Sequence, residues 1–374
     1  MPFLAFVRRT CSKVYKSLLS RDHFAPHTYA GFEGYYSRTQ LDDGGTLAVI
    51  FCWVKNAPRR ANLVHVSYTP PVSGSPSAAF KHEFFPDRLK VATHPKRPDG
   101  QQPFIVHMPG IGTMDLNNDS VKYIVKTSDP DLSLSLEVTD RVPWSDVTPL
   151  AGPMGILAVF SRFFPLNWHV FCTSSKATYS FTYGGLTQEG TGTSHVEKNW
   201  GTSFPSGWIW SQSFADAEPK KSLCLAGGVA LPGVQAYLIG YRSSNLHWDF
   251  RPPFAMSIWP LPSFMRVEHD SRAGTFKLTV RSFTRKLVIT EDAPLDSFMG
   301  LACPLADGHE PMFAYESFVA RTQIEAWERA YPWQEWRLVE KGPCGVTAEG
   351  KPCSALEFGG MFSHLVRERT RKSD

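Results

Sequence analysis

LSLSLEV, residues 132–138, alternates apolar and polar side chains at every step. Because successive side chains of a β-strand point to opposite faces, this pattern predicts a strand with one buried and one solvated face. Residues 276–281 alternate in the same way, and further apolar runs cover 46–54, 61–68, 104–108, 177–183, 222–230 and 286–290. With 28 glycines and 29 prolines as turn formers, these short strands predict an all-β chain of antiparallel barrels or sandwiches.

Domain organisation follows from the length of the chain and the positions of its loops. A chain of 374 residues, 42% of them hydrophobic, can bury more than one core. The Pro/Gly-rich passage 143–155 and the loop at 184–194 are the best internal joints. We therefore predict two β domains, 23–190 and 191–366, followed by a basic tail at 367–374.

Helical periodicity is limited to 321–330 and to the N-terminus, where residues 1–22 predict a short amphipathic helix. Its apolar face carries Phe3, Leu4, Val7, Cys11, Val14, Tyr15 and Leu18. A membrane-surface helix, an organelle-targeting peptide and a helix docked on its own domain all fit this pattern. Since the apolar run is too short to span a bilayer and no cleavage site follows it, we expect a cytoplasmic protein. Peripheral membrane contact through this helix and organelle targeting stay open.

Composition and missing motifs argue against several classes of function. The net charge of +4 is spread along the chain, which does not favour a nucleic-acid partner. Seven widely spaced cysteines without a CxxC pair indicate free thiols in a reducing compartment and no structural zinc site. The sequence has no phosphate-binding loop, dinucleotide fingerprint, HExxH or GxSxG. We therefore predict neither a cofactor nor a metal, and no pattern indicates an oligomeric state.

The densest group of chemically active side chains is HVEKNWGTSFPSGWIWSQ, residues 195–212. In a strand over 195–200, one face would carry His195, Glu197 and Asn199. GTSFPSG at 201–207 is a turn sequence, and a strand after it would present Trp208, Trp210 and Gln212 together. We therefore predict a hairpin that places titratable groups beside a wall of indole rings.

Two interpretations of this hairpin are compatible with its residues. In a barrel interior, low dielectric would raise the pKa of a carboxyl and keep an acid protonated near neutral pH, while indole faces stabilise a nearby cation. Alternatively, the aromatic residues pack in a core and a Glu–Lys pair closes a barrel end as an ion pair.

Several motifs resemble those of the tocopherol cyclase family. Glu197-Lys198-Asn199-Trp200-Gly201, followed by Phe204-Pro205, Trp208, Trp210 and Gln212, is similar to the family signature EK[DN]WG…FP…WxWxQ. In the same order, FEGYY at 32–36 resembles FEGWY, GPMG at 152–155 resembles a segment that a histidine follows, here His169, and ALEFGG at 355–360 resembles a glycine-rich strand. The resemblance therefore runs from about residue 32 to residue 360.

The resemblance implies two lipocalin-like antiparallel β-barrels packed together, and a cofactor-free cyclase that closes a chromanol ring on a prenylated phenol. Such chemistry needs an acid for the alkene, a dry pocket, electron-rich walls and a base for the phenolic proton. Tyr35 and Asn167-Trp168 depart from the family pattern, and no plastid-type transit peptide is evident. We therefore predict a broader activity, in which a hydrophobic prenylated, terpenoid or polyketide-derived natural product cyclises by alkene protonation and attack of an internal oxygen.

Candidate catalytic residues are Glu197, our first choice for the general acid, Glu33, the second, and His195 and His169, which would relay protons or orient the phenol. Each has a structural alternative. Glu197 would pair with Lys198 or another cation, Glu33 would accept hydrogen bonds from Lys198 or Arg38, and the histidines would be structural. Candidate substrate-binding residues are Tyr36, Lys198, Asn199, Trp200, Trp208, Trp210 and Gln212.

Two other functions of the protein toward a hydrophobic small-molecule partner are compatible with the sequence. A pericyclase would accelerate a cycloaddition by orientation and hydrogen bonding, without a strong acid. A non-catalytic lipocalin-like carrier needs the same apolar cavity but no proton transfer. Dependence on an ionisable residue separates the acid-catalysed cyclase from the pericyclase, and turnover separates both from the carrier.

Overall fold

A computed structural model describes residues 25–71, 78–97, 101–117, 119–147, 151–214 and 220–373. The chain divides into two compact units. Unit 1 is Met1–Phe204 with Pro304–His309, and unit 2 is Pro205–Cys303 with Glu310–Asp374. The predicted N-terminal helix at 1–22 lies outside the described residues.

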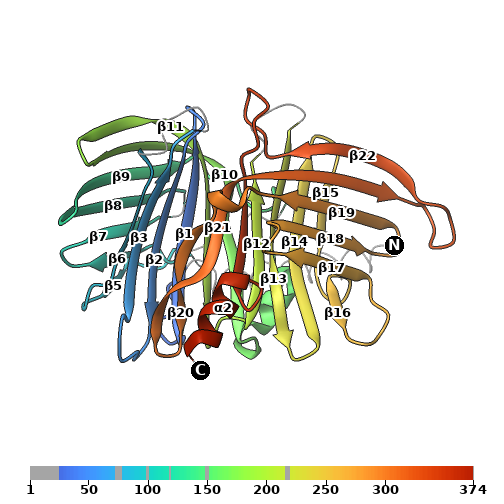
Figure 1. Cartoon of the computed structure of the whole chain (residues 1–374), viewed down its shortest axis with the longest axis horizontal. Helices are drawn as coiled ribbons and strands as arrows, with labels where there is room; N and C mark the ends of the chain where they lie inside the picture. The colour runs from blue at the N-terminus through green and yellow to red at the C-terminus, as the bar shows by residue number, and fades with distance from the viewer. Residues whose placement is uncertain are drawn as a thin grey trace. The chain divides into compact units, whose positions relative to one another are not determined.

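Unit 1 is built on one antiparallel sheet of eleven strands, drawn in blue to green in Figure 1. Its strands are β1 (Phe32–Leu41), β2 (Thr46–Val54), β3 (Asn62–Thr69), β4 (Phe80–Phe84), β5 (Lys90–Thr93), β6 (Phe104–Met108), β7 (Gly112–Leu116), β8 (Val121–Ser128), β9 (Asp131–Thr139), β10 (Leu166–Tyr183) and β11 (Leu186–Gly201). Their order is β4-β3-β2-β1-β11-β10-β9-β8-β7-β6-β5, so β11 joins two meanders at the centre of the sheet. A 3-10 helix, η2 (Gly155–Phe163), connects β9 to β10.

Unit 2 is built on a second antiparallel sheet, of twelve strands. These are β12 (Gly207–Ser213), β13 (Lys221–Leu231), β14 (Val234–Ser243), β15 (His247–Phe250), β16 (Met256–Ile258), β17 (Met265–Asp270), β18 (Thr275–Arg281), β19 (Arg285–Asp292), β20 (Met299–Leu305), β21 (Gly308–Glu328), β22 (Arg337–Cys344) and β23 (Ser354–Gly360). The main order is β15-β14-β13-β12-β23-β21-β19-β18-β17, with β16 on β14 and both β20 and β22 on β21. The helices are η3 (Leu295–Ser297) and α2 (His364–Ser373).

Each sheet curls around its own hydrophobic core, as the period of two predicts. In β9, Leu132, Leu134, Leu136 and Val138 are buried in the core of unit 1, and the serines between them are exposed. In β18, Phe276, Leu278 and Val280 are buried in the core of unit 2. The prediction of an all-β chain with two lipocalin-like antiparallel sheets is confirmed, each sheet forming a half-barrel.

Three local predictions differ from the structure. The predicted helix at 321–330 is wrong, because Ile324 and Ala326 alternate with less buried residues and join the core as part of β21. The predicted basic tail belongs largely to helix α2. The predicted domain boundary at 190/191 falls inside the continuous strand β11, whereas the units divide after Phe204. Among the residues described, no helix is long and apolar enough to span a bilayer.

Candidate functional site

The predicted hairpin over 195–212 does not form. Strand β11 pairs with β1 and β10 in unit 1, whereas β12 pairs with β13 and β23 in unit 2. The turn-like segment 201–207 therefore connects the two sheets. Its proline and glycines, which would favour a tight turn, lie in this connection instead. Each half of the signature must be assigned to its own unit.

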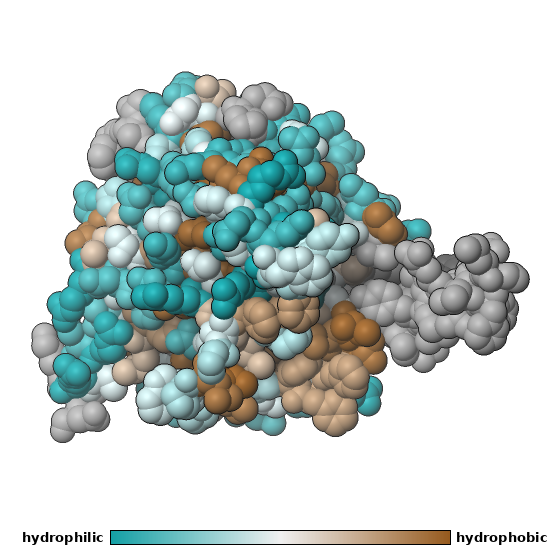
Figure 2. Space-filling model, turned by 90° about the vertical axis from the view of Figure 1, so that its right-hand side faces the viewer, coloured by the Kyte–Doolittle hydropathy of each residue, from teal (hydrophilic) through white to brown (hydrophobic). Residues whose placement is uncertain are grey.

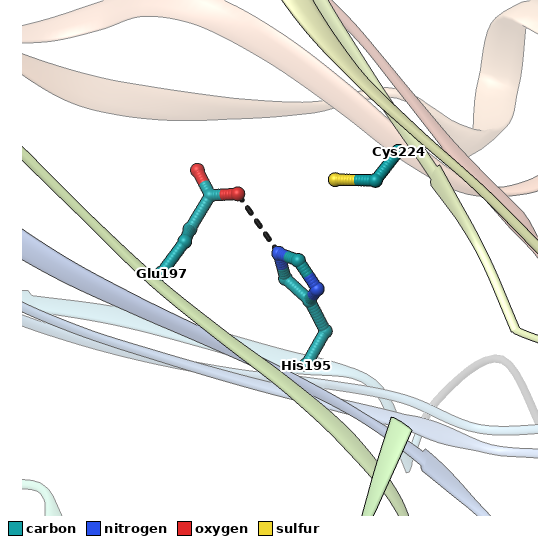
Figure 3. A group of neighbouring side chains, drawn as sticks. All are labelled: His195, Glu197 and Cys224. Carbon is teal, nitrogen blue, oxygen red and sulfur yellow. Dashed lines mark hydrogen bonds and ion pairs between the residues drawn. The ribbon is translucent and has the colours of Figure 1, made fainter. Parts of the chain in front are cut away.

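In unit 1, His195 and Glu197 form a buried pair on one face of β11. The imidazole Nε2 lies 2.8 Å from Oε2 of the carboxyl, and both side chains project from the same side of the strand (Figure 3). This geometry follows from the i, i+2 spacing in an extended strand. Glu197 thus pairs with a histidine rather than with Lys198, and Asn199, two residues further along this face, is half-buried.

The pair belongs to a row of polar side chains, which we call the polar face: Tyr36, Arg38 and Gln40 of β1, and His195, Glu197 and Asn199 of β11. The register places Tyr36 opposite Glu197 and Arg38 opposite His195. Polar residues on a sheet face that points away from its core are ordinarily solvated. Here Arg38 and His195 are each 0% exposed, so this face holds an uncommon concentration of buried charge.

The opposite face of the same two strands carries the Glu33 cluster, which consists of His27, Glu33, Tyr35, Lys198 and Trp200. Glu33 Oε1 accepts hydrogen bonds from the Tyr35 hydroxyl at 2.8 Å and the Lys198 ammonium at 3.2 Å. Glu33 Oε2 accepts one from the His27 backbone N–H at 2.5 Å. Because residues 33 and 38 point to opposite faces, the alternative in which Arg38 binds Glu33 is wrong and the one with Lys198 is confirmed.

Electrostatics keep the Glu33 carboxyl ionised. Burial would raise its pKa, but the Lys198 ammonium and the hydrogen bonds from His27 outweigh burial and hold the pKa below its ordinary value. Burial and the adjacent Glu33 carboxylate raise the pKa of Tyr35, so its hydroxyl stays a donor. An ionised carboxylate with these donors accepts hydrogen bonds, which favours the structural alternative for Glu33 over the role of general acid.

Trp200 is engaged by the same cluster. Its ring stacks on His27 with centroids 4.2 Å apart, and Lys198 Nζ lies 4.8 Å from its centroid. Lys198 also donates to the backbone carbonyl of Ala25 at 2.7 Å. The ammonium therefore occupies the cation-binding position over this indole, which ties residues 25–33 to β11. In this structure the Lys198 ammonium and the Trp200 ring contact each other and residues 25–33.

His169 lies on the same face as the Glu33 cluster, because it is opposite Lys198 in the β10–β11 pair. A Cβ atom at Gly152 would come within 2.5 Å of its Nδ1. The first glycine of GPMG therefore lets the backbone pass against a buried histidine, which supplies a packing reason for the motif. His169 and the His195–Glu197 pair are on different faces, so the four predicted catalytic residues do not form one constellation.

The other half of the signature lies in unit 2. Trp208, Trp210 and Gln212 share the face of β12 opposite Ile209, which is buried in the core of that unit. The indole N–H of Trp208 donates to Oε1 of Glu357 on the neighbouring strand β23. Within unit 1, Trp200 and Tyr36 lie on opposite faces of the sheet, and the two tryptophans of β12 belong to the sheet of unit 2.

Glu291 and Glu316 are buried carboxyls that the sequence did not predict, and Glu291 has the better-defined surroundings. Its Oε1 accepts hydrogen bonds from the Ser211 hydroxyl at 2.7 Å and the Thr322 hydroxyl at 2.9 Å. Its Oε2 is buried with no hydrogen-bond partner among the described residues. Burial raises the pKa of Glu291 to about 7, against the smaller effect of the hydroxyls. The signal was present in LVITE, residues 287–291, where an acid occupies the next inward position after Leu287 and Ile289.

The sequence is similar to proteins of one family. Residues 117–349 match the family model described as tocopherol cyclase-like. A chloroplastic tocopherol cyclase of Zea mays is 25% identical over 226 residues, 58% of this chain and 44% of that protein. A probable chloroplastic tocopherol cyclase of Oryza sativa subsp. japonica is 31% identical over 127 residues, 32% of this chain and 27% of that protein. The matches span less than half the length of these two relatives.

The fold is also similar to a solved structure. The crystal structure of CghA with Sch210972 superposes with a TM-score of 0.58 at 10% identity, covering 90% of each chain. A second crystal structure of CghA gives the same TM-score, also at 10% identity, over 91% of this chain and 94% of CghA. At this identity the likeness concerns the fold. Because the family model covers more than half of the sequence, including His169 and the segment 195–212, the chain belongs to the tocopherol cyclase-like family.

Proposed function

We propose that the protein is a cofactor-independent intramolecular cyclase of a hydrophobic natural product. The observation that carries this proposal is the His195–Glu197 pair, 2.8 Å apart and buried, within the family's central signature. Family membership supports the cyclase class, and the prenylated, terpenoid or polyketide-derived substrate remains part of the proposal. The missing nucleotide and metal motifs are consistent with chemistry that needs only a proton.

In the proposed reaction, the His195–Glu197 pair delivers one proton to an alkene carbon of the substrate. The tertiary cation formed at the neighbouring carbon is attacked by a phenolic oxygen of the same molecule, and that oxygen returns its proton to the pair. The reaction is an isomerisation, so atoms and charge balance without a cofactor. A buried pair suits this role because, without water, the proton passes to the substrate rather than to solvent.

The Glu33 cluster has a supporting role in this proposal. Its ionised carboxylate and Lys198 ammonium hold residues 25–33 against β11, the strand that carries the proposed acid. Rigid support from the neighbouring strand fixes the orientation of a catalytic side chain, and small displacements of such a group reduce the rate strongly. Glu33 is thus a positioning residue and Glu197 the catalytic residue.

The test is turnover of a panel of prenylated phenols in deuterated buffer, followed by mass spectrometry. Loss of a general acid typically costs about 10²–10⁴-fold in rate, so Glu197→Gln should lose that much activity together with deuterium incorporation at carbon. The matched control is Glu137→Gln on β9, because its side chain is 46% exposed and β10 separates β9 from β11. This control should retain full turnover.

Other outcomes separate the alternatives. Cyclisation without deuterium, unchanged in Glu197→Gln, would identify a pericyclase. Tight binding of the panel without conversion would favour a carrier. If Glu291→Gln lost turnover and Glu197→Gln did not, the general acid would be Glu291 of unit 2. A carboxyl with a pKa of about 7 can hold a proton near neutral pH and donate it.

A further inference from the structure

Unit 2 exposes large apolar side chains on three loops, which we call the aromatic end: residues 259–264 after β16, the turn 282–284 and the loop 329–336. Trp259 is 82% exposed and Trp333 is 80% exposed. Leu261, Phe283 and Tyr331 are each more than half exposed. Figure 2 views the side on which the β21–β22 loop lies in Figure 1 and shows hydrophobic residues gathered on part of it.

Contacts of Phe264, Phe283 and Arg329 connect the three loops. Phe264 and Phe283 have ring centroids 5.8 Å apart, and both pack edge-on against Phe254. The Arg329 guanidinium Nε donates to the carbonyl of Phe283 at 2.8 Å, which joins the turn to the loop that carries the stacked rings of Tyr331 and Trp333. These contacts fix the rings of Phe264 and Phe283, and the Tyr331 and Trp333 rings stack on each other. The backbone of Trp259 is held by its N–H bond to the carbonyl of Gly233.

Basic side chains accompany the exposed rings. Segments 281–286 and 328–337 contain five basic residues, Arg281, Arg285, Lys286, Arg329 and Arg337, against two acidic ones, Glu328 and Glu335, a net charge of +3. Arg285, Arg329 and Arg337 line a cleft of about 710 Å³ together with Glu328 and Glu335, so the charged residues of the lining carry a net charge of +1. Planar guanidinium groups suit bidentate contacts with phosphate, so the cleft has the chemistry to receive an anionic headgroup.

The combination points to one kind of partner. Indole and phenol rings prefer the boundary between lipid headgroups and acyl chains, and arginines beside them attract anionic lipids. A contiguous exposed apolar surface of this kind marks an interaction site. We infer that the aromatic end docks the protein on an anionic lipid surface, with Trp259 and Trp333 entering the headgroup region and the arginines binding lipid phosphate.

This surface is distinct from the N-terminal segment for which the sequence left membrane contact open, and it is independent of the cyclase proposal. In the docked state, unit 2 would contact the lipid bilayer, in which apolar substrates dissolve. The positive charge of the surface should make the protein prefer anionic over neutral bilayers. Both kinds of bilayer have an interface in which the aromatic rings can insert, but only the anionic one attracts the arginines by its net charge.

The test is flotation of the purified full chain with vesicles of phosphatidylcholine, alone or mixed with phosphatidylglycerol. The wild type should bind the anionic vesicles, and added salt should weaken binding because the charge contribution is screened. Trp259→Ser with Trp333→Ser should lose at least tenfold in vesicle affinity, and Arg285→Gln with Arg337→Gln should lose the preference for phosphatidylglycerol. Brominated lipid should quench wild-type tryptophan fluorescence more than that of the serine variant.

The matched control is Phe160→Ser with Phe163→Ser, which removes two exposed aromatic residues from η2 of unit 1. It should bind vesicles as the wild type does, and thermal melts should confirm that all variants are folded. Wild-type binding by the tryptophan variant, failure of the wild type to bind anionic vesicles, or a loss confined to the η2 variant would overturn the proposal.

Discussion

Glu33 is held by donors from three residues, His27, Tyr35 and Lys198, and its carboxylate and the Lys198 ammonium compensate each other's burial. Removing one member of a buried ion pair leaves the other charge without its partner in a low-dielectric environment. The cost of a substitution here therefore depends on whether the remaining charge is also removed.

We expect Glu33→Gln to lower the free energy of unfolding by roughly 3–5 kcal/mol, because Lys198 stays buried without its counter-charge. The double variant Glu33→Gln/Lys198→Met should be less destabilised than the single one. Urea denaturation measures both values. Asp140→Asn is the control: it breaks the exposed pair with Lys176 and should cost less than about 1 kcal/mol. Strictly additive costs at Glu33 and Lys198 would contradict the coupling.

The contribution of Glu33 to the free energy of unfolding decreases at acidic pH. Its folded-state pKa lies below the ordinary carboxyl value, so the folded protein binds fewer protons at this site than the unfolded chain at mildly acidic pH. The stability that Glu33 contributes is therefore present above pH 4.5 and is lost as the pH falls through the depressed pKa. The Gln variant lacks this acid-dependent loss.

At the scale of elements, strands β12 and β23 approach closely because a glycine faces an indole. Trp208 is paired with Gly359, and a Cβ at position 359 would fall 1.9 Å from Cε2 of the indole. The glycine-rich end of β23 is thus a packing device that lets the Trp208 ring lie across the neighbouring strand. The ring in turn donates its N–H to Glu357.

We expect Gly359→Ala to destabilise the protein by about 1–3 kcal/mol, because the added methyl group overlaps the indole and forces the ring or the strand to shift. The same substitution should cost less in a Trp208→Leu background, where the fused ring atoms that meet the methyl are absent. A thermodynamic cycle from urea midpoints measures this coupling. Equal costs in both backgrounds would show that strand conformation, rather than the indole, requires glycine at 359.

Element types were predictable where the pattern is local. Strand β9 follows from LSLSLEV because alternation within one strand determines which side chains can be buried together. The pairing partners of β11 and of β12 were not predictable from the turn sequence between the two strands. GTSFPSG permits a reversal of the chain, but the longer pairing surfaces of β1 and β10 with β11 are formed by residues distant in sequence. The helix predicted at 321–330 failed for the same reason, since β19 supplies the partner that makes this stretch a strand.

At the scale of the whole molecule, buried groups with shifted pKa values give global stability a pH dependence. Glu291 binds its proton more tightly in the folded state, with a pKa of about 7 against an ordinary value of 4.5. Between these values the folded protein holds a proton that the unfolded chain has lost, so this residue makes the free energy of unfolding fall as the pH rises. The full effect is roughly 3 kcal/mol.

Glu291→Gln should remove this slope and leave a protein more stable than the wild type above pH 7, because the amide carries no charge and can still accept from Ser211 and Thr322. Urea unfolding from pH 4 to pH 8 measures the difference between the two proteins. The difference matters because burial lowers the pKa of His309 to about 4, and this histidine makes stability rise with pH over part of the same range. Parallel curves for wild type and variant would contradict the raised pKa.

Six of the cysteines lie in the described part of the chain, and none of these six forms a disulfide, as their spacing predicts; all six are buried, and Cys11 lies outside the described part. The separation of the two units was also expected from length, but its position at Phe204/Pro205 was not. A composition change marked the loops at 143–155 and 184–194, whereas the true division lies within the signature segment, whose residues are conspicuous for their chemistry rather than for flexibility.

The sequence by itself determined the fold class, the inward and outward faces of most strands, and the sharing of one face by His195 and Glu197, because these depend on the two-residue period of a single strand. Only the tertiary structure decided which strands pair, that Glu33 binds Lys198 and is ionised, and that the Glu291 carboxyl is buried with hydroxyl partners. Those properties depend on burial and on charges brought together from distant parts of the chain, and a local sequence pattern does not determine them.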